Sequence, residues 1–186
     1  MAKVNKNIVM QGLSGSLGDQ VVLKQDKAGR TIVSTKPAFN SKREFSDEQK
    51  AHQANFKEAA AYARMAARTE PIYALKAEGK AQSAYNVAMA DWFNKPEIDE
   101  VNLSGWSGQA GGTIRVKALD DVKVKQVTVV ITNEQDVEVE RGTAAANGEL
   151  WWEYTTTASV TGQPKVTVEV MDLPGNIAQA MRQRQN

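Results

Sequence analysis

The sequence contains no cysteine and only one histidine, His52. Without cysteine there is no disulfide, no thiolate nucleophile and no cysteine-ligated metal. A Ser-His-Asp triad or a histidine-ligated zinc site would have to use His52, which we expect on a helix surface without a catalytic role. The sequence therefore predicts a protein that is not an enzyme, with no catalytic residue, no metal site and no cofactor.

Long apolar runs are also missing. No run approaches the roughly 20 residues that a membrane-spanning helix needs, so we expect no membrane insertion. The basic first residues are not followed by the apolar stretch of a secretion signal. We expect the chain to stay in the cytoplasm, to leave by a signal-free route or to have lost a signal; a cell-surface or extracellular assembly stays open beside a cytoplasmic one. Hydrophobic residues make up 41% and charged residues 24%, which is a globular composition.

Charge is unevenly distributed along the chain. Fifteen Lys/Arg and nine Asp/Glu precede Pro96 (+6), whereas eight and thirteen follow from there (−5). Residues 1–44 alone carry eight basic and three acidic residues (+5). A basic arm and an acidic body can attract copies of the protein head to tail. Chance variation of surface charge is the alternative interpretation.

Residues 1–44 predict an extended arm that contains a β-hairpin. Two β-prone runs, residues 20–25 and 30–35, flank a turn in which Gly29 can adopt positive φ. Pro37 ends the second strand because it has no N–H to donate. An isolated two-stranded hairpin is marginal in water, so this one has to pack on its own chain or on a neighbour.

A helical segment is predicted over residues 45–95. Ser46 and Gln49 have the spacing of a capping box, which begins a long helix. Small residues recur at three- and four-residue intervals on that helix and permit close approach of another element; the stripe consists of Phe56, Ala59, Ala60, Ala63, Ala66 and Ala67. Pro71 begins a second, short helix, and a third is predicted over residues 81–93.

From residue 96 onward the hydrophobic period changes from 3.6 to 2. Seven β-prone segments follow, at residues 98–103, 113–119, 124–132, 137–141, 150–156, 165–171 and 176–181. Their number and spacing are typical of an immunoglobulin-like β-sandwich. The predicted fold class is therefore α+β, with a hairpin arm and short helices before a seven-stranded sandwich over residues 96–186. The expected inward positions include Ile114, Val116, Val127, Val129, Val166, Val168 and Val170.

Two resemblances extend this interpretation. The C-terminal part, over residues 97–182, is similar to the immunoglobulin-like modules of bacterial surface and adhesive proteins; the matching residues are 112–116, 118–122, 127–131, 150–155 and 172–178. That resemblance implies a fold and names no ligand. The N-terminal part looks like an uncharacterised bacterial family with a Gly-Leu-Ser-Gly hairpin arm and a helical segment. The matching residues are 12–15, 36–37 and 83–86, and this resemblance implies architecture only.

Three groups of residues are candidates for a site. Aspartates and glutamates could gather at one pole of the sandwich and hold calcium, or they could simply cap turns; they are Glu97, Asp99, Asp120, Asp121 and Asp172. Asp136, Glu138 and Glu140 alternate with valines, which predicts a row of carboxylates on one strand face, either solvated or a dock for a basic arm. Of Trp151 and Trp152, one should point inward and one outward, where it could bind a sugar or a partner.

The basic arm could also contact nucleic acid phosphates, but it lacks the aromatic residues expected for base stacking, so we do not expect nucleic acid binding. The leading hypothesis is a non-enzymatic structural subunit that self-associates into a fibre, sheath or surface filament through the arm. Its proposed self-association residues are Val21, Leu23, Arg30, Ile32, Val33, Asp136, Glu138 and Glu140. The alternatives are a monomeric adhesion module that binds a glycan or protein, and a component of a phage-tail or contractile-injection particle.

Overall fold

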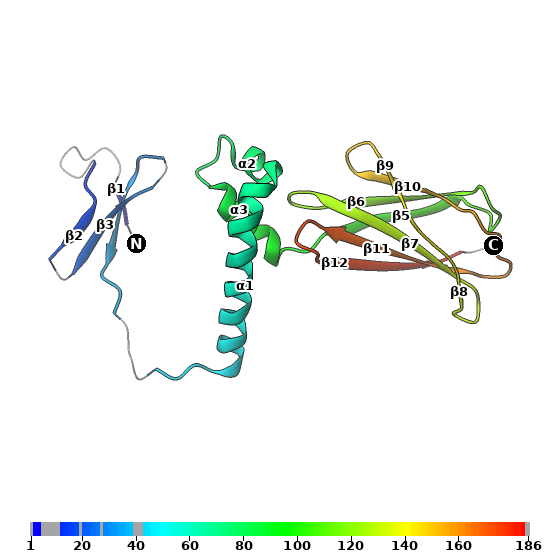
Figure 1. The fold of residues 1–186 in the computed structure, drawn as a ribbon, viewed down its shortest axis with the longest axis horizontal. Helices are drawn as coiled ribbons and strands as arrows, with labels where there is room; N and C mark the ends of the chain where they lie inside the picture. Colours follow the sequence, from blue (N-terminus) through cyan, green and yellow to red (C-terminus); the bar gives the residue numbers. More distant parts are fainter. Residues whose placement is uncertain (1, 5–11, 19, 27, 39–42, 185–186) are drawn as a thin grey trace. The chain divides into compact units, whose positions relative to one another are not determined.

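The computed structural model describes residues 2–4, 12–18, 20–26, 28–38 and 43–184. The chain divides into two compact units, Met1–Val87 and Ala88–Asn186. Figure 1 shows a small sheet and two helices in the first unit and a β-sandwich in the second, with a third helix that spans the boundary at residues 87/88. The finer division predicted from the sequence, at residues 44/45 and 95/96, stays a prediction.

The first unit contains a four-stranded antiparallel sheet in the order β1-β4-β3-β2. Its strands are β1 (Ala2–Val4), β2 (Gly15–Leu17), β3 (Val21–Gln25) and β4 (Thr31–Thr35). The predicted hairpin is β3–β4. In its turn, Asp26 exchanges backbone hydrogen bonds with Gly29 and Arg30, and Gly29 has a φ of 72°. The two short strands on either side of the hairpin were not predicted.

Each helix begins at a local signal in the sequence, either a capping side chain or a proline. They are α1 (Asp47–Thr69), α2 (Pro71–Ala77) and α3 (Ala84–Phe93). The Ser46 hydroxyl accepts from the Gln49 N–H and the Gln49 side chain accepts from the Ser46 N–H, so the predicted capping box is present. The Ser83 hydroxyl accepts from the Asn86 N–H, which explains why α3 begins three residues later than predicted.

Alanine dominates the buried face of α1. Ala59, Ala60, Ala63 and Ala66 are buried, whereas Phe56, predicted on the same stripe, is 51% exposed. Tyr62 of α1 and the buried Tyr73 of α2 meet edge to face, with their hydroxyl oxygens 2.6 Å apart. None of the helices in the described residues is long and apolar enough to cross a membrane.

The second unit is a β-sandwich of two four-stranded sheets, β5-β6-β10-β9 and β12-β11-β7-β8. The strands are β5 (Glu97–Gly105), β6 (Thr113–Leu119), β7 (Val124–Thr132), β8 (Glu138–Thr143), β9 (Ala145–Asn147), β10 (Trp151–Thr155), β11 (Lys165–Asp172) and β12 (Ile177–Gln183). The described part of this unit has no helix after α3. The sequence predicted seven of these eight strands; it missed β9, whose three residues are all exposed and carry no alternating pattern.

The core of the sandwich lies between the two sheets, and all seven predicted inward residues belong to it with 0% exposure. On β11, Val166, Val168 and Val170 alternate with partly exposed residues, as a period of 2 requires. The strand phase predicted for β6, β7 and β11 is therefore confirmed.

Candidate functional site

The arm sheet, defined as β1–β4, has one face richer in apolar residues than the other. Leu23 pairs with Val33, and Val21 pairs with Leu17, so these four side chains share a face because directly paired residues lie on the same side of a sheet. Ile32 pairs with Lys24 and lies on the opposite face. Of the apolar residues proposed from the sequence, the sheet thus brings Val21, Leu23 and Val33 together and separates Ile32 from them.

Burial within the arm sheet is slight. Leu23 is 6% exposed, Val21 and Val33 are half-buried, and Leu17 is 66% exposed. Among the described side chains of this sheet, Leu23 is the only buried hydrophobic one. The apolar face therefore still presents several side chains that water contacts.

Arg30, the basic residue proposed for contacts with another copy, already has a partner. Its Nε lies 2.6 Å from Oδ2 of Asp26, and the other oxygen of Asp26 accepts from the N–H groups of Ala28 and Arg30. The backbone hydrogen bond from Arg30 is the main cause that holds the pKa of Asp26 below its usual value. This ion pair closes the hairpin turn and does not point to an external ligand.

The predicted row of three carboxylates does not form. Ile131 pairs with Glu140 and Thr132 with Glu138, so Val139 is the additional residue of a β-bulge. The bulge breaks the alternation: Glu140 points inward with the buried Ile131, whereas Glu138 lies on the outer face. The sequence cannot show this, because a bulge depends on the partner strand.

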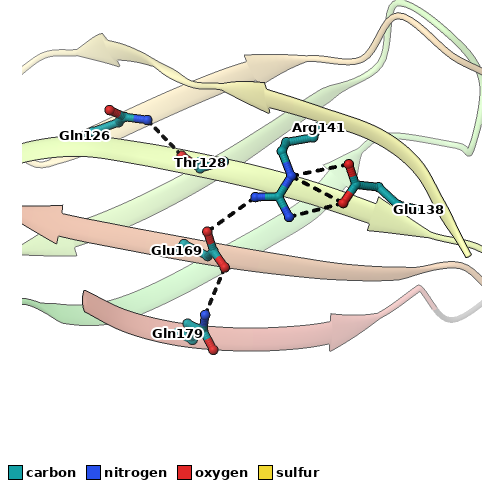
Figure 2. Close-up of polar contacts among 6 residues, drawn as sticks. All are labelled: Gln126, Thr128, Glu138, Arg141, Glu169 and Gln179. Atoms are coloured by element: carbon teal, nitrogen blue, oxygen red, sulfur yellow. Dashed lines mark hydrogen bonds and ion pairs between the residues drawn. The ribbon is translucent and has the colours of Figure 1, made fainter. Parts of the chain in front are cut away.

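The two outer carboxylates are paired within the sandwich. Asp136, which has a φ of 59° in the turn before β8, lies 2.6 Å from Nζ of Lys165. Glu138 contacts Arg141, whose guanidinium also reaches Glu169 of β11 at 3.6 Å. Figure 2 shows this chain of polar contacts continuing from Glu169 to Gln179 of β12 across the outer face of the sheet.

Glu140 forms a buried hydrogen-bond centre. Its Oε1 accepts from the Tyr154 hydroxyl at 2.6 Å and from the Thr157 N–H and hydroxyl at 2.6 and 2.8 Å; Oε2 accepts from the Ala158 N–H at 3.1 Å. Burial alone would raise the pKa of Glu140, but these hydrogen bonds outweigh it and the pKa is lowered. Burial and the bond to Glu140 raise the pKa of Tyr154 to about 12. The cluster fixes β8 to the segment after β10.

Gly142 makes room for this cluster. A Cβ at this position would lie 2.5 Å from the Tyr154 ring, so only glycine lets the ring pass β8. Sequence reasoning missed the cluster. Its signal was Tyr154, an inward tyrosine whose hydroxyl requires a partner once it is buried.

The residues considered for calcium do not converge. Asp99 pairs with Lys117, Asp121 accepts from the Asn94 side chain, and Asp120 accepts from the N–H groups of Val122 and Lys123. Asp172 is fully buried and accepts from the N–H groups of Gly175 and Asn176 and from the Asn176 side chain. Within the described residues no cluster of three or more metal-ligating side chains occurs. The turn-capping alternative describes Asp120 and Asp172.

The tandem tryptophans take the predicted orientations. Trp152 pairs with the buried Val116 and packs against the core, whereas Trp151 lies on the other face with the Arg115 guanidinium 4.8 Å above its ring. Stacking on arginine occupies one face of the outward indole. Binding of a sugar there stays a prediction.

Comparisons with known proteins do not identify a family. No family model matches this chain, and no curated protein matches it. Solved structures with partial similarity include CopC from Methylosinus trichosporium OB3b (13% identity, TM-score 0.37, 47% of this chain and 89% of that chain). A lipoprotein from Bacteroides thetaiotaomicron has 19% identity and a TM-score of 0.28 over 50% of this chain and 78% of that chain.

The N-terminal part of the bacterial S-layer protein SbsC is a third such structure, with 13% identity and a TM-score of 0.32. The match covers 72% of this chain and 38% of that chain. Similarities at this level support no conclusion about function. The functional argument for this protein therefore depends on its own residues.

Proposed function

We propose that this chain is a non-enzymatic structural subunit that self-associates into a repeating assembly, such as a fibre, sheath or surface filament, through its arm sheet. One observation carries the proposal: Leu23 is the only buried hydrophobic side chain among those described in a four-stranded sheet. A small sheet is stable only when its apolar face is covered, because burial of apolar surface is the main favourable term in folding and association. A second copy of the chain provides that cover.

The sandwich offers an edge to which an arm can add backbone hydrogen bonds. Register shifts interrupt the edge strands β5 and β8, and β9 has only three residues. In contrast, β12 pairs with β11 over seven residues without a shift, and its exposed side chains include Ile177 and Met181. Bulges and short length protect edge strands from added strands, so β12 is the least protected edge.

Two further considerations support self-association into a repeating assembly. The two antiparallel sheets around one core fit the immunoglobulin-like class inferred from the sequence, a class that recurs in extracellular and surface proteins. A contact between an arm and the edge of another copy is heterologous, and such contacts produce filaments when the rotation between copies does not close.

Ion pairs should contribute less to the affinity between copies of the chain than the charge distribution suggests. Arg30, Asp136 and Glu138 all have partners in their own chain, so a contact between them across copies would replace existing pairs. Exposed pairs contribute about 0–1 kcal/mol each, and their exchange contributes less. Apolar burial and strand pairing therefore provide the affinity, and the opposite charges of arm and body provide long-range attraction.

A matched pair of substitutions tests the proposal. Leu17→Lys changes a residue of the arm sheet that is 66% exposed, and Leu75→Lys changes a residue of α2 that is 64% exposed. Because both leucines contact water in the single chain, neither substitution should unfold it. Size-exclusion chromatography with light scattering should show large species for the parent protein and Leu75→Lys, and a shift to monomer for Leu17→Lys. A monomeric parent at high concentration, or equal assembly of both variants, would refute the proposal.

A further inference from the structure

A pocket of about 540 Å³ lies beside the end of β5 and the end of β12. Its lining combines apolar walls with hydrogen-bond donors; the main residues are Val101, Leu103, Ser104, Trp106, Arg182 and Arg184. Among the residues that the structure describes, no acidic side chain lines it. The pocket is therefore positively charged, although the part of the chain that contains it has an excess of acidic residues.

The two arginines of this pocket differ from the other two arginines of the sandwich. Arg115 pairs with Glu153, and Arg141 pairs with Glu138. Arg182 and Arg184 form no ion pair with any residue in the described ranges; the side-chain hydrogen bond of Arg182 goes to the adjacent Met181 carbonyl oxygen, at 3.2 Å. Two guanidinium groups beside one pocket, with no carboxylate among its described lining residues, provide many hydrogen-bond donors, and a guanidinium has no acceptor.

One of these guanidinium groups, that of Arg184, lies against Gly108. A Cβ at Gly108 would lie 2.6 Å from Nη1 of Arg184, so the guanidinium occupies the space that the missing side chain leaves. The Arg184 N–H donates to the Pro164 carbonyl oxygen at 3.1 Å, which attaches the end of β12 to the segment before β11.

Trp106 adds an independent observation. It lines the same pocket, it is 3% exposed, and its Nε1–H has no hydrogen-bond acceptor in the described part of the protein. A buried donor without an acceptor is destabilising, because it has lost its hydrogen bonds to water. The indole nitrogen itself is shielded from solvent, so an oxygen in the pocket accepts from it only when the lining residues move.

We propose that this pocket binds an oxyanion, a carboxylate, sulfate or phosphate group, held by Arg182 and Arg184. Guanidinium groups match the geometry of such anions and bind them with two parallel hydrogen bonds. The half-buried Val101 and Leu103 provide an apolar wall for the carbon part of a carboxylate or ester ligand. This inference does not depend on self-association through the arm.

Titration of the full-length Leu17→Lys protein, which is expected to be monomeric, with sodium acetate, sodium sulfate and sodium phosphate in separate experiments tests the site. Sodium chloride keeps the ionic strength constant, so that general screening of charge does not contribute. Nuclear magnetic resonance should show saturable shifts of the amides of residues 101–106 and 182–184, together with the Trp106 indole N–H. The anion with the lowest dissociation constant identifies the preferred group.

Charge-matched variants decide the outcome. Arg182→Gln and Arg184→Gln should each weaken binding at least about tenfold, because a hydrogen bond to a charged group contributes about 1.5–3 kcal/mol. Arg68→Gln, on the exposed surface of α1, removes the same charge elsewhere and should leave binding unchanged. The proposal is wrong if none of the three anions gives saturable shifts, or if both pocket variants bind as tightly as Arg68→Gln. A Trp106 indole resonance that does not move at saturation would remove Trp106 from the site.

Discussion

Single side chains in the sandwich core have strict requirements because both sheets contact them. Val129 is 0% exposed and pairs with Val168 of β11, which is equally buried. Val129→Asp should destabilise the sandwich by roughly 3–5 kcal/mol, since the carboxylate would have no partner there. Val137→Asp is the control, because Val137 is 58% exposed. Urea unfolding followed by tryptophan fluorescence compares the two; equal midpoints for both variants would show that the strand phase is wrong.

Glu140 predicts how stability depends on pH. Its pKa is lowered in the folded protein, so folding favours the ionised form. The stabilisation is therefore fully present above the ordinary glutamate pKa of 4.5 and is lost as the pH falls through the lower folded value. Asp172 acts in the opposite direction, because burial, its main cause, raises its pKa and folding favours its protonated form.

A comparison of the parent protein with Glu140→Gln separates the contributions of Glu140 and Asp172 to the free energy of unfolding. Glu140→Gln keeps the shape of the side chain and removes its charge, so its free energy of unfolding should be below that of the parent above pH 4.5. The difference between the two free energies of unfolding should narrow as the pH falls towards 3. The contribution of Asp172 is the same in both proteins, so it cancels from this difference. Urea unfolding between pH 3 and 7 provides the curves. A gap that stays constant over this range would mean that the ionisation of Glu140 does not contribute.

At the scale of elements, the sequence predicts those parts whose signals are local. The capping box at Ser46, the start of α2 at Pro71 and the hairpin turn closed by hydrogen bonds of Asp26 all form as expected. Each depends on residues within one turn of the chain, so the sequence contains the whole cause. The core valines of β6, β7 and β11 belong to the same class, because a period of 2 fixes their phase.

The elements and sites that sequence reasoning missed depend on contacts between distant residues. The bulge at Val139 arises from the pairing of β8 with β7, and it moves Glu140 from the expected outer row into the core. The pocket with Arg182 and Arg184 exists because the end of β12 lies beside the end of β5. Strand β9 has no hydrophobic alternation, and only its pairing with β10 defines it. The sequence gives no local sign of any of these contacts.

At the scale of the whole molecule, deletion of the arm tests whether self-association can be removed without unfolding the protein. Unit Ala88–Asn186 has its own core of thirteen residues, all from the sandwich. The arm sheet buries little apolar surface of its own. The helices that follow it bury apolar side chains of α1 and α2. Deletion of residues 1–36 should therefore leave a soluble, folded and largely monomeric protein.

Salt should separate the forces that hold the proposed assembly of the full-length chain together. Raising sodium chloride from about 0.1 to 1 M shortens the Debye length from about 10 to 3 Å and removes the long-range attraction between a basic arm and an acidic body. Apolar burial and backbone pairing persist, so light scattering should show slower growth of the assembly and only a partial loss of its final mass. Complete dissociation at 1 M would assign the interface to charge alone. The truncated protein gives the other test: normal assembly would place the interface outside the arm, and unfolding would make the arm part of the subunit core.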